Sequence, residues 1–373
     1  MAQHDQPLHR LGIIGTGSRG RNLIECLKHS GRGQVVCAAD PSEVSRSRAK
    51  DMLAAGCPLH TDPRYVLDDP NVDIAYIGTP NHTHADLVIS ALDAGKDVFS
   101  EKPMATSVED CDRMISAIER TGRFFALTMQ NRYSFATRMI TDMLRDGTLG
   151  KLVMMWCHEF RKPFSRMKVD DWIVYREKSG GPFVEKNSHH WDILNFWGQS
   201  SAKTVHALTT TTGIHKPGDI WDCGWVNVEY ENGIIANLGL SMITPHGHDL
   251  TMTAIGTEGW VEGIRTPDGG TVKFHENSRP EEKVFRANLP PEQAQLGHAG
   301  AEFMMLEHLF DSIEAGVEPQ TNCWWGRESI IIGVAAERSA AEGRVVQVDE
   351  IRAESRFPKA MPVFQNAETS VSK

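Results

Sequence analysis

Positive charge is in short supply in this sequence, and no stretch gathers Lys and Arg into a basic block. Asp and Glu number 49 against 39 Lys and Arg, which gives a formal net charge of -10 at neutral pH. Proteins that bind nucleic acid concentrate basic side chains on one face or along one helix. The charge pattern therefore argues against a nucleic-acid partner.

Long apolar runs and paired cysteines are also missing. No segment reaches the length of a membrane span, and the start of the chain, MAQHDQPLHR, lacks the apolar stretch of a signal peptide. The 7 cysteines are odd in number and scattered, without a CxxC pair or metal-type spacing. We therefore expect a cytoplasmic protein with reduced cysteines, no membrane partner and no metal.

The chain is long enough for two domains, and its first part has a regular alternation. Short apolar segments that end in Gly, Pro, Asp or Lys alternate with segments of helical period. The strand-like segments are 11–17, 34–40, 73–80, 97–103 and 124–130, and the helical ones are 21–30, 42–53, 84–95 and 107–122. This alternation predicts βαβ units and an α/β, doubly wound parallel sheet of the Rossmann type over residues 1–130.

The pattern changes after residue 130. A helix is predicted over 134–145, strands over 151–160, 203–212, 224–233, 233–243, 249–264 and 270–277, and helices over 299–314 and 328–342. Strands that follow one another without helices predict an α+β domain, residues 131–373, built on a large and mostly antiparallel open sheet. A sheet with one uncovered face would expose apolar surface, so we expect a homodimer or homotetramer.

A phosphate-binding motif lies where the first predicted strand meets the first helix. The motif GxGxxG comprises Gly15, Thr16, Gly17, Ser18, Arg19 and Gly20. Its glycines permit a tight turn, close approach of a pyrophosphate and close packing of helix on strand. Asp40 ends the second strand, where an acid accepts the ribose hydroxyls of an adenosine and repels a 2′-phosphate. The motif with Asp40 predicts NAD as cofactor. NADP is the less favoured alternative, kept open by Arg46 and Arg48, which follow closely.

Two further strand ends carry polar residues that should face the cofactor. Glu101 and Lys102 end the segment DVFSEK, and ligands of open α/β sheets bind outside the carboxyl ends of strands. Lys102 can hydrogen-bond a substrate hydroxyl, although a solvated turn lysine is the alternative. The residues predicted to lie beside the nicotinamide half are Thr79, Pro80, Asn81 and His84. The pair His82 and His84 has no third ligand at metal-like spacing, so we reject a metal site there.

The stretch PFVEKNSHHWD, residues 182–192, admits three interpretations: a metal site, an acid–base device or a solvated helix start. If a helix begins near Glu185, then Glu185 and His189 are four residues apart and share one face. His190 would then pack elsewhere. A metal would need more converging ligands than this helix offers, so we favour an acid–base device.

Together these motifs resemble the Gfo/Idh/MocA family of oxidoreductases. The resemblance extends along nearly the whole chain, through the segments GTGSRG, TPN with the following His84, SEKPMA, NRY at 131–133, the turn at 147–150 and SGGPFVEKNSHHWD. It implies a Rossmann domain followed by a substrate-binding domain whose open sheet is often used for oligomerisation. Most members oxidise a ring hydroxyl of a sugar or cyclitol with NAD or NADP.

The resemblance also implies roles for residues. The family's acid–base motif, D-x-G-x-H-x-x-D, falls on Glu185, Asn187, His189 and Asp192, so the first Asp is replaced by Glu and the Gly by Asn. We interpret His189 as the general base, Lys102 as the group that polarises the developing carbonyl, and Glu185 as an orienting group. The roles of Lys102 and His189 are open to reversal.

Residues outside this motif are predicted to contact the substrate. They are Asn131, Tyr133, Arg161 with Lys162 beside it, and Trp172 with Asp171 and Tyr175 as neighbours, while His298 is a weaker candidate. Arg161 and Lys162 suit an anionic group, with a solvated loop as the alternative. The indole of Trp172 suits a sugar ring, with core packing as the alternative. The predicted substrate is a sugar, sugar acid or cyclitol whose ring hydroxyl is oxidised. Two alternatives are an NAD-dependent redox glycosidase without net redox change and a non-catalytic sugar sensor.

Overall fold

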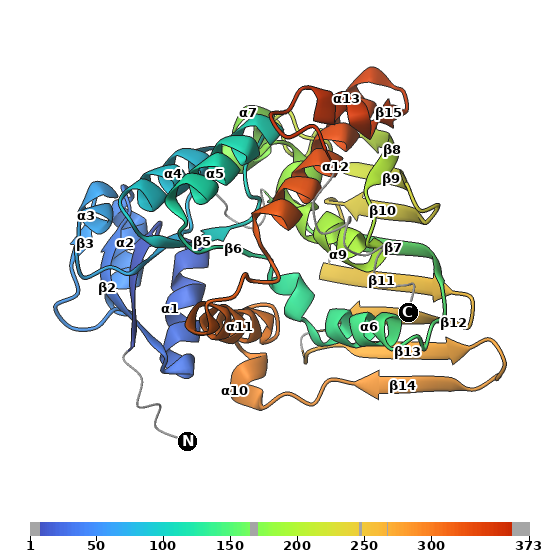
Figure 1. The fold of residues 1–373 in the computed structure, drawn as a ribbon, viewed down its shortest axis with the longest axis horizontal. Coiled ribbons are helices and arrows are strands. Elements are labelled where there is room, and N and C mark those ends of the chain that lie inside the picture. Colours follow the sequence, from blue (N-terminus) through green and yellow to red (C-terminus); the bar gives the residue numbers. More distant parts are fainter. Residues whose placement is uncertain (1–7, 165–170, 246–247, 267, 360–373) are drawn as a thin grey trace.

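The structure is a computed structural model of the 373-residue chain and describes residues 8–164, 171–245, 248–266 and 268–359. Two sheets organise the molecule, and helices from the end of the chain lie between them (Figure 1). None of the helices in the described ranges is long and apolar enough to cross a bilayer.

The first sheet has six strands in the order β3-β2-β1-β4-β5-β6, and every neighbouring pair is parallel. Its strands are β1 (His9–Ile14), β2 (Gly33–Ala39), β3 (Leu59–His60), β4 (Ile74–Ile77), β5 (Asp97–Glu101) and β6 (Phe125–Thr128). The helices between them are α1 (Ser18–Ser30), α2 (Glu43–Lys50), α3 (Arg64–Leu67), α4 (His84–Asp93) and α5 (Val108–Thr121). The predicted doubly wound parallel sheet is confirmed.

The second sheet has nine strands in the order β14-β13-β12-β11-β7-β10-β9-β8-β15, and only the pair β7 and β10 is parallel among those described. The strands are β7 (Leu152–Arg161), β8 (Ala202–Thr210), β9 (Cys223–Tyr230), β10 (Ile235–Ser241), β11 (His248–Gly256), β12 (Gly259–Arg265), β13 (Thr271–Glu276), β14 (Glu282–Arg286) and β15 (Val346–Gln347). This confirms the predicted large and mostly antiparallel sheet.

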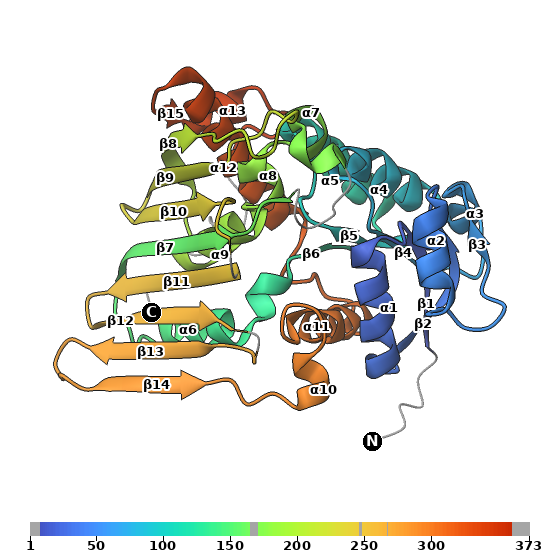
Figure 2. The same ribbon diagram turned by 180° about the vertical axis from the view of Figure 1, so that it is seen from behind.

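Helices cover one face of the second sheet. They are α6 (Phe135–Arg145), α9 (Ser188–Gly198) and α12 (Cys323–Glu342), which contact β12, β7 and β8 respectively. The shorter helices are α7 (Arg176–Ser179), α8 (Pro182–Glu185), α10 (Pro291–Ala294) and α13 (Val348–Ala353). Figure 2 shows the sheet from behind, with the strands in front of α6. The face turned to the viewer there is formed by strands.

The structure corrects two boundaries. One strand is predicted over 249–264, but the chain reverses after Gly256, and β11 pairs with β12 as an antiparallel hairpin. A polar turn of Thr257 and Glu258 between two glycines allows this reversal. The last long helix begins at Cys323 rather than 328, because the Asn322 side chain caps it by accepting from the amide of Trp324 at 3.1 Å.

Helix α11 (Ala301–Ala315) crosses back to the first sheet and packs beside α1 (Figure 1). Its Leu309 and Phe310 belong to the same buried cluster as Leu11 and Ile13 of β1. The packing brings the residues around His298 close to the glycine-rich loop. The division of the chain at residue 130 remains a prediction. Helices α11 and α12 of the second segment both contact the first 130 residues, because α11 packs on α1 and α12 contacts α5 and β6.

Candidate functional site

The glycine-rich loop joins β1 to α1, and its three glycines differ in their steric surroundings. Gly15 has φ +94°, and a Cβ there would lie 2.5 Å from the carbonyl oxygen of Gly78. A Cβ on Gly20 would lie 2.2 Å from the carbonyl oxygen of Gly15, so helix and loop pack as closely as glycine allows. At Gly17 a Cβ would meet nothing within 4 Å. The loop is thus closed on its inner side and open at Gly17, which fits a pyrophosphate at the start of α1.

Asp40 is fixed at the end of β2 next to this loop. Its Oδ2 accepts from the backbone N–H of Thr16 at 2.8 Å, and its Oδ1 accepts from that of Ser42 at 2.8 Å. Arg46 is held away from the carboxylate, since its Nη1 donates to the carbonyl oxygens of Asp40 at 2.6 Å and Pro41 at 2.9 Å. An acid at the position of Asp40 suits the ribose hydroxyls of NAD, and Arg46 is engaged by backbone carbonyls instead of the carboxylate.

Arg19 makes contacts that its motif position did not predict. Its Nη2 donates to Oε1 of Glu101 at 2.8 Å, and its Nη1 donates to Oε1 of Glu302 on α11 at 2.5 Å. The hydroxyl of Tyr76 donates to the same Glu101 oxygen at 2.7 Å. The side chain thus ties the glycine-rich loop to β5 and to α11. Nothing local in the sequence links residues 19 and 302, so no sequence pattern could have indicated this contact.

The loop after β4 is anchored rather than open at two predicted positions. The ring of His84 is fully buried, with Nδ1 2.8 Å from the carbonyl oxygen of Pro103 and Nε2 2.9 Å from that of Thr79. Both ring nitrogens of His84 are thus engaged by backbone carbonyls, so the ring holds two loops together, and its contact with a cofactor remains a prediction. Asn81 is also buried, and its Nδ2 donates to the carbonyl oxygen of Ser179 at 3.0 Å. Thr79 and Pro80 are half-buried, and their cofactor contact remains a prediction.

Lys102 follows β5 and forms a buried ion pair with Glu185. Its Nζ donates to Oε1 of Glu185 at 2.9 Å and to the backbone carbonyl oxygen of the same residue at 2.8 Å. Burial opposes ionisation of Glu185, but the charges of Lys102 and Lys186 outweigh burial and lower the pKa of its carboxyl group. Glu185 is therefore a carboxylate at neutral pH.

The structure corrects the prediction of one helix starting near Glu185. Helix α8 ends at Glu185, and α9 begins at Ser188 after a turn at Lys186 and Asn187. The backbone of Asn187, with φ -90° and ψ 1°, lies outside the helical range and caps α9. Glu185 and His189 therefore sit on two helices, and the Glu185 carboxylate meets Lys102.

His189 is enclosed in the site with only 3% of its surface exposed. Burial, together with the charges of Lys102 and Lys186, lowers the pKa of its imidazole well below the usual value, so the ring is neutral at physiological pH. Its Nδ1 is buried, and none of the residues that the structure describes forms a hydrogen bond with it. A buried polar atom left unpaired is costly, which is typical of a position that a ligand completes.

A second buried charged group, formed by Glu159, Lys186 and His190, lies beside the Lys102–Glu185 pair and was not predicted. Glu159 on β7 accepts from Nζ of Lys186 at 3.0 Å and lies 3.2 Å from Nε2 of His190. Burial is the main reason that the pKa of Lys186 falls to about 8. Alternation along β7 could have indicated Glu159, because an acid at an inward position of a half-buried strand needs a buried partner.

Asp192, the final acid of the family motif, is structural in this chain. Both of its carboxylate oxygens accept from Arg132 at 2.6 Å, and both side chains are buried. The Arg132 guanidinium also lies over the ring of Phe196 at 4.1 Å. This ion pair anchors the short helix Gln130–Tyr133, which carries two of the predicted substrate residues.

Those two residues occupy different surroundings. Asn131 is buried, and its Oδ1 accepts from Nη1 of Arg265 at 3.1 Å. Tyr133 lines a cavity of 210 Å³ that also touches Ala299 and Gly300. Their contact with a substrate remains a prediction.

The remaining candidates divide by burial. Arg161 is buried, lies over the ring of Phe164 at 4.7 Å, and contributes to the lowered pKa of Glu185. Lys162 is exposed, and Trp172 is half-buried against the large core. The side chain of Asp171 lies outside the described residues. Arg161 therefore acts electrostatically on the site, whereas a substrate contact by Trp172 remains a prediction.

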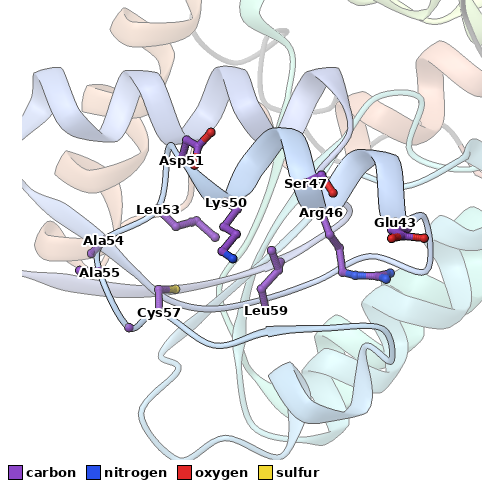
Figure 3. Close-up of a pocket in the computed structure, with 11 residues that line it drawn as sticks. Glu43, Arg46, Ser47, Lys50, Asp51, Leu53, Ala54, Ala55, Cys57 and Leu59 are labelled. Carbon is purple, nitrogen blue, oxygen red and sulfur yellow. The ribbon is translucent and has the colours of Figure 1, made fainter.

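A larger cavity of 520 Å³ lies along α2 (Figure 3). Its lining includes Arg46, Lys50 and Cys57 but none of Lys102, Glu185 and His189. It is separate from the candidate site. In the described parts of the chain, no group of three or more His, Cys, Asp or Glu side chains is placed to hold a metal ion.

Comparison with known proteins decides the family. Residues 9–129 match the profile described as the oxidoreductase family with an NAD-binding Rossmann fold, and residues 141–348 match the C-terminal α/β domain of the same family. The chain belongs to the Gfo/Idh/MocA oxidoreductase family. The predicted family, enzyme class and NAD cofactor are thereby confirmed.

Individual relatives are distant. The chain is 25% identical over 351 residues to scyllo-inositol 2-dehydrogenase (NAD(+)) of Bacillus subtilis, covering 92% of this chain and 97% of that protein. It is 28% identical over 267 residues to 2,7-anhydro-N-acetylneuraminate hydratase of Mediterraneibacter gnavus, covering 70% and 68%. Among solved structures, levoglucosan dehydrogenase in complex with NADH has a TM-score of 0.80 at 20% identity, covering 92% and 99%.

Proposed function

We propose that this Gfo/Idh/MocA oxidoreductase oxidises a ring hydroxyl of a sugar, sugar acid or cyclitol with NAD. The observation that carries the proposal is the grouping of the Lys102–Glu185 ion pair with a neutral, enclosed His189 beyond the carboxyl end of β5. The names of relatives, an inositol dehydrogenase and a levoglucosan dehydrogenase, support this substrate class.

The residues present fit the cofactor. The open side at Gly17 would receive the pyrophosphate, and Asp40 would accept the adenosine ribose hydroxyls. Thr79 and Pro80, after the neighbouring strand β4, would lie beside the nicotinamide half. When bound, NAD accepts the hydride that leaves the carbinol carbon.

The chain itself handles the proton and the charge. His189 is neutral, so its imidazole can accept the hydroxyl proton as the C–H bond breaks. Lys102, held in place by Glu185, donates a hydrogen bond to the substrate oxygen and stabilises the negative charge that develops there. Glu185 keeps the lysine oriented and balances its charge.

The cofactor and substrate domains are proposed to be residues 1–130 and 131–373, with α11 crossing back to the first.

We also infer that a second copy of the chain covers the open face of the nine-stranded sheet. Trp225, Leu208 and Ile235 on that face are 49%, 64% and 48% exposed. Aromatic contacts continue along the same face, with the ring centroids of His158 and Trp225 5.1 Å apart. Apolar surface gathered in this way is typical of a protein interface.

A panel assay tests the proposal. The purified enzyme is mixed with NAD or NADP and with inositols, aldoses, sugar acids and anhydro sugars, and absorbance of reduced nicotinamide is followed. We expect NADH to accumulate with one substrate class and with NAD in preference to NADP. Because one relative is named a hydratase, the assay has to measure NADH as well as sugar conversion. Conversion of a sugar without accumulation of NADH would contradict a dehydrogenase. Absence of any conversion across the panel would contradict the substrate class.

A further inference from the structure

A histidine–carboxylate pair lies at the start of α11, outside the Lys102–Glu185 group. Nδ1 of His298 lies 2.5 Å from Oε1 of Glu302, and Nη1 of Arg19 lies 2.5 Å from the same oxygen. A Cβ on Gly297 would come within 2.3 Å of the Glu302 carboxylate, so glycine leaves room for the carboxylate in this position. Arg19 and His298 hold the pKa of Glu302 at about 2 despite burial. The carboxylate stays ionised and fixes the imidazole through Nδ1–H, which leaves Nε2 as the acceptor.

The backbone around this histidine is unusual. His298 and Ala299 both have φ +54°, and Gly300 follows with φ +83°. Two consecutive non-glycine residues in the left-handed region cost free energy, and such conformations persist where the surroundings impose them, often at functional sites. Here the imposed turn directs the imidazole toward α9.

The imidazole of His298 lies beside that of His189. Their ring centroids are 6.4 Å apart with the planes inclined at 61°, a separation that one bridging water can span. The two rings differ in access to solvent. The His298 side chain is 26% exposed, whereas His189 is 3% exposed as a residue. His298 therefore stands between the enclosed base and solvent.

The proposed reaction requires a route by which the buried base loses its proton. Each turnover leaves one proton on His189, which is buried among the positive charges of Lys102 and Lys186. A base in these surroundings has to lose the proton before the next substrate binds. Among the described histidines, His298 has a carboxylate behind it and a ring that is both next to His189 and partly exposed.

We propose that His298, oriented by Glu302, passes the proton from His189 to solvent after each hydride transfer. In this step the substrate O–H bond breaks and its proton goes to His189, while the C–H electron pair leaves as hydride to NAD. His189 then gives a proton to Nε2 of His298 through the bridging water, and His298 releases it to solvent. Glu302 acts as a positioning residue. The inference rests on the proposed dehydrogenase function.

Chemical rescue tests the step. The variant His298→Ala is compared with the parent enzyme in dilute and in concentrated imidazole buffer, at saturating NAD and substrate. We expect kcat to fall by roughly 10²-fold in dilute buffer and to recover as imidazole rises, with NAD affinity unchanged. Glu302→Gln should lower kcat in the same direction and also respond to imidazole. His29→Ala, which removes an exposed histidine of α1, is the matched control and should need no rescue.

The outcomes separate the two proposals. A His298→Ala enzyme with parental kcat in dilute buffer, or one whose lost activity does not respond to imidazole, would overturn the proton-transfer role. A merely structural role predicts the second of these results. Failure of the proposed function would be seen in the parent enzyme, which would then reduce no NAD with any substrate. In that case the reaction would release no proton for His298 to carry.

Discussion

Lys102 and Glu185 are 83 residues apart in the sequence, yet Nζ of the lysine lies 2.9 Å from Oε1 of the glutamate and 2.8 Å from its carbonyl oxygen. The pair connects the end of β5, in the cofactor-binding sheet, to the helix pair α8 and α9. It orients a cation at the place where a substrate oxygen would gain charge. It also supplies the hydrogen-bonded cation of a buried acid, so structural and chemical roles need separate tests.

Removal of the lysine should abolish activity and weaken the fold. Lys102→Met leaves the Glu185 carboxylate buried without its cation, which we expect to cost about 3–5 kcal/mol of the free energy of unfolding. The double variant Lys102→Met with Glu185→Leu removes both charges and should regain most of that stability but not kcat. Chemical denaturation and steady-state kinetics measure the two effects. Recovery of kcat in the double variant would show that the pair is structural only.

Loss of the enclosed histidine should affect chemistry without affecting the cofactor. His189→Ala is expected to lower kcat by roughly 10²–10⁴-fold, the range for a positioned proton acceptor. Its ring makes no contact with the glycine-rich loop among the described interactions, so NAD affinity should stay at the parental value. Isothermal titration with NAD, beside the kinetic assay, measures both quantities. Parental turnover in this variant would refute the assignment of His189 as the base.

The glycine-rich loop allows a contrast between two similar changes. Gly17 has φ -61° and open space at its Cβ position, so Gly17→Ala should leave thermal unfolding unchanged. The added methyl occupies the side on which a pyrophosphate would sit, and we expect NAD affinity to fall roughly tenfold or more. Gly20→Ala should destabilise the protein as well, because its Cβ would lie 2.2 Å from the carbonyl oxygen of Gly15. If Gly17→Ala binds NAD with the parental affinity, the side of the loop at Gly17 is not where the pyrophosphate binds.

Local motifs explain which parts of this site were predictable. Lys102 ends a strand and Gly15 begins a turn, and both features follow from a few neighbouring residues. The partners of Arg19 did not follow, because Glu302 reaches the loop only through the packing of α11 on α1. The helix break at Asn187 was missed for a related reason. Its backbone conformation serves the capping of α9, whereas the i, i+4 spacing of Glu185 and His189 suggested one continuous helix.

Glu337 on α12 gives a pH prediction whose sign can be worked out. Its Oε1 accepts from the amide of Phe183 at 3.0 Å and its Oε2 from the indole of Trp221 at 3.0 Å, and burial raises its pKa to about 7. The folded-state pKa exceeds the unfolded value of 4.5, so the folded chain binds more protons in this range. The contribution of neutral Glu337 to the free energy of unfolding is therefore fully present below the unfolded pKa of 4.5, and it is lost as pH rises through the folded-state pKa of about 7.

The isosteric variant isolates this contribution. The free energy of unfolding of the parent relative to Glu337→Gln should fall by about 3 kcal/mol between about pH 5 and pH 8. The control is Glu354→Gln. Hydrogen bonding from Arg338 lowers the pKa of Glu354, so this carboxylate stays ionised throughout the same range and the corresponding difference should be constant. Urea denaturation at each pH measures both differences. A difference that rises with pH for Glu337→Gln would contradict a buried neutral acid.

The open face of the second sheet should hold the oligomer together. Trp225 pairs with Leu208 across β9 and β8, and the same register continues through Gly239 on β10. Trp225→Asp places a charge in the middle of this apolar surface, so sedimentation analysis at micromolar concentration should show the parent as an oligomer and the variant as a monomer. Val317→Asp alters another exposed apolar residue, 54% exposed and on the loop after α11, and should leave the oligomer intact. A parent protein that is monomeric at this concentration would contradict the proposed interface. An oligomer that survives Trp225→Asp would move it to another surface.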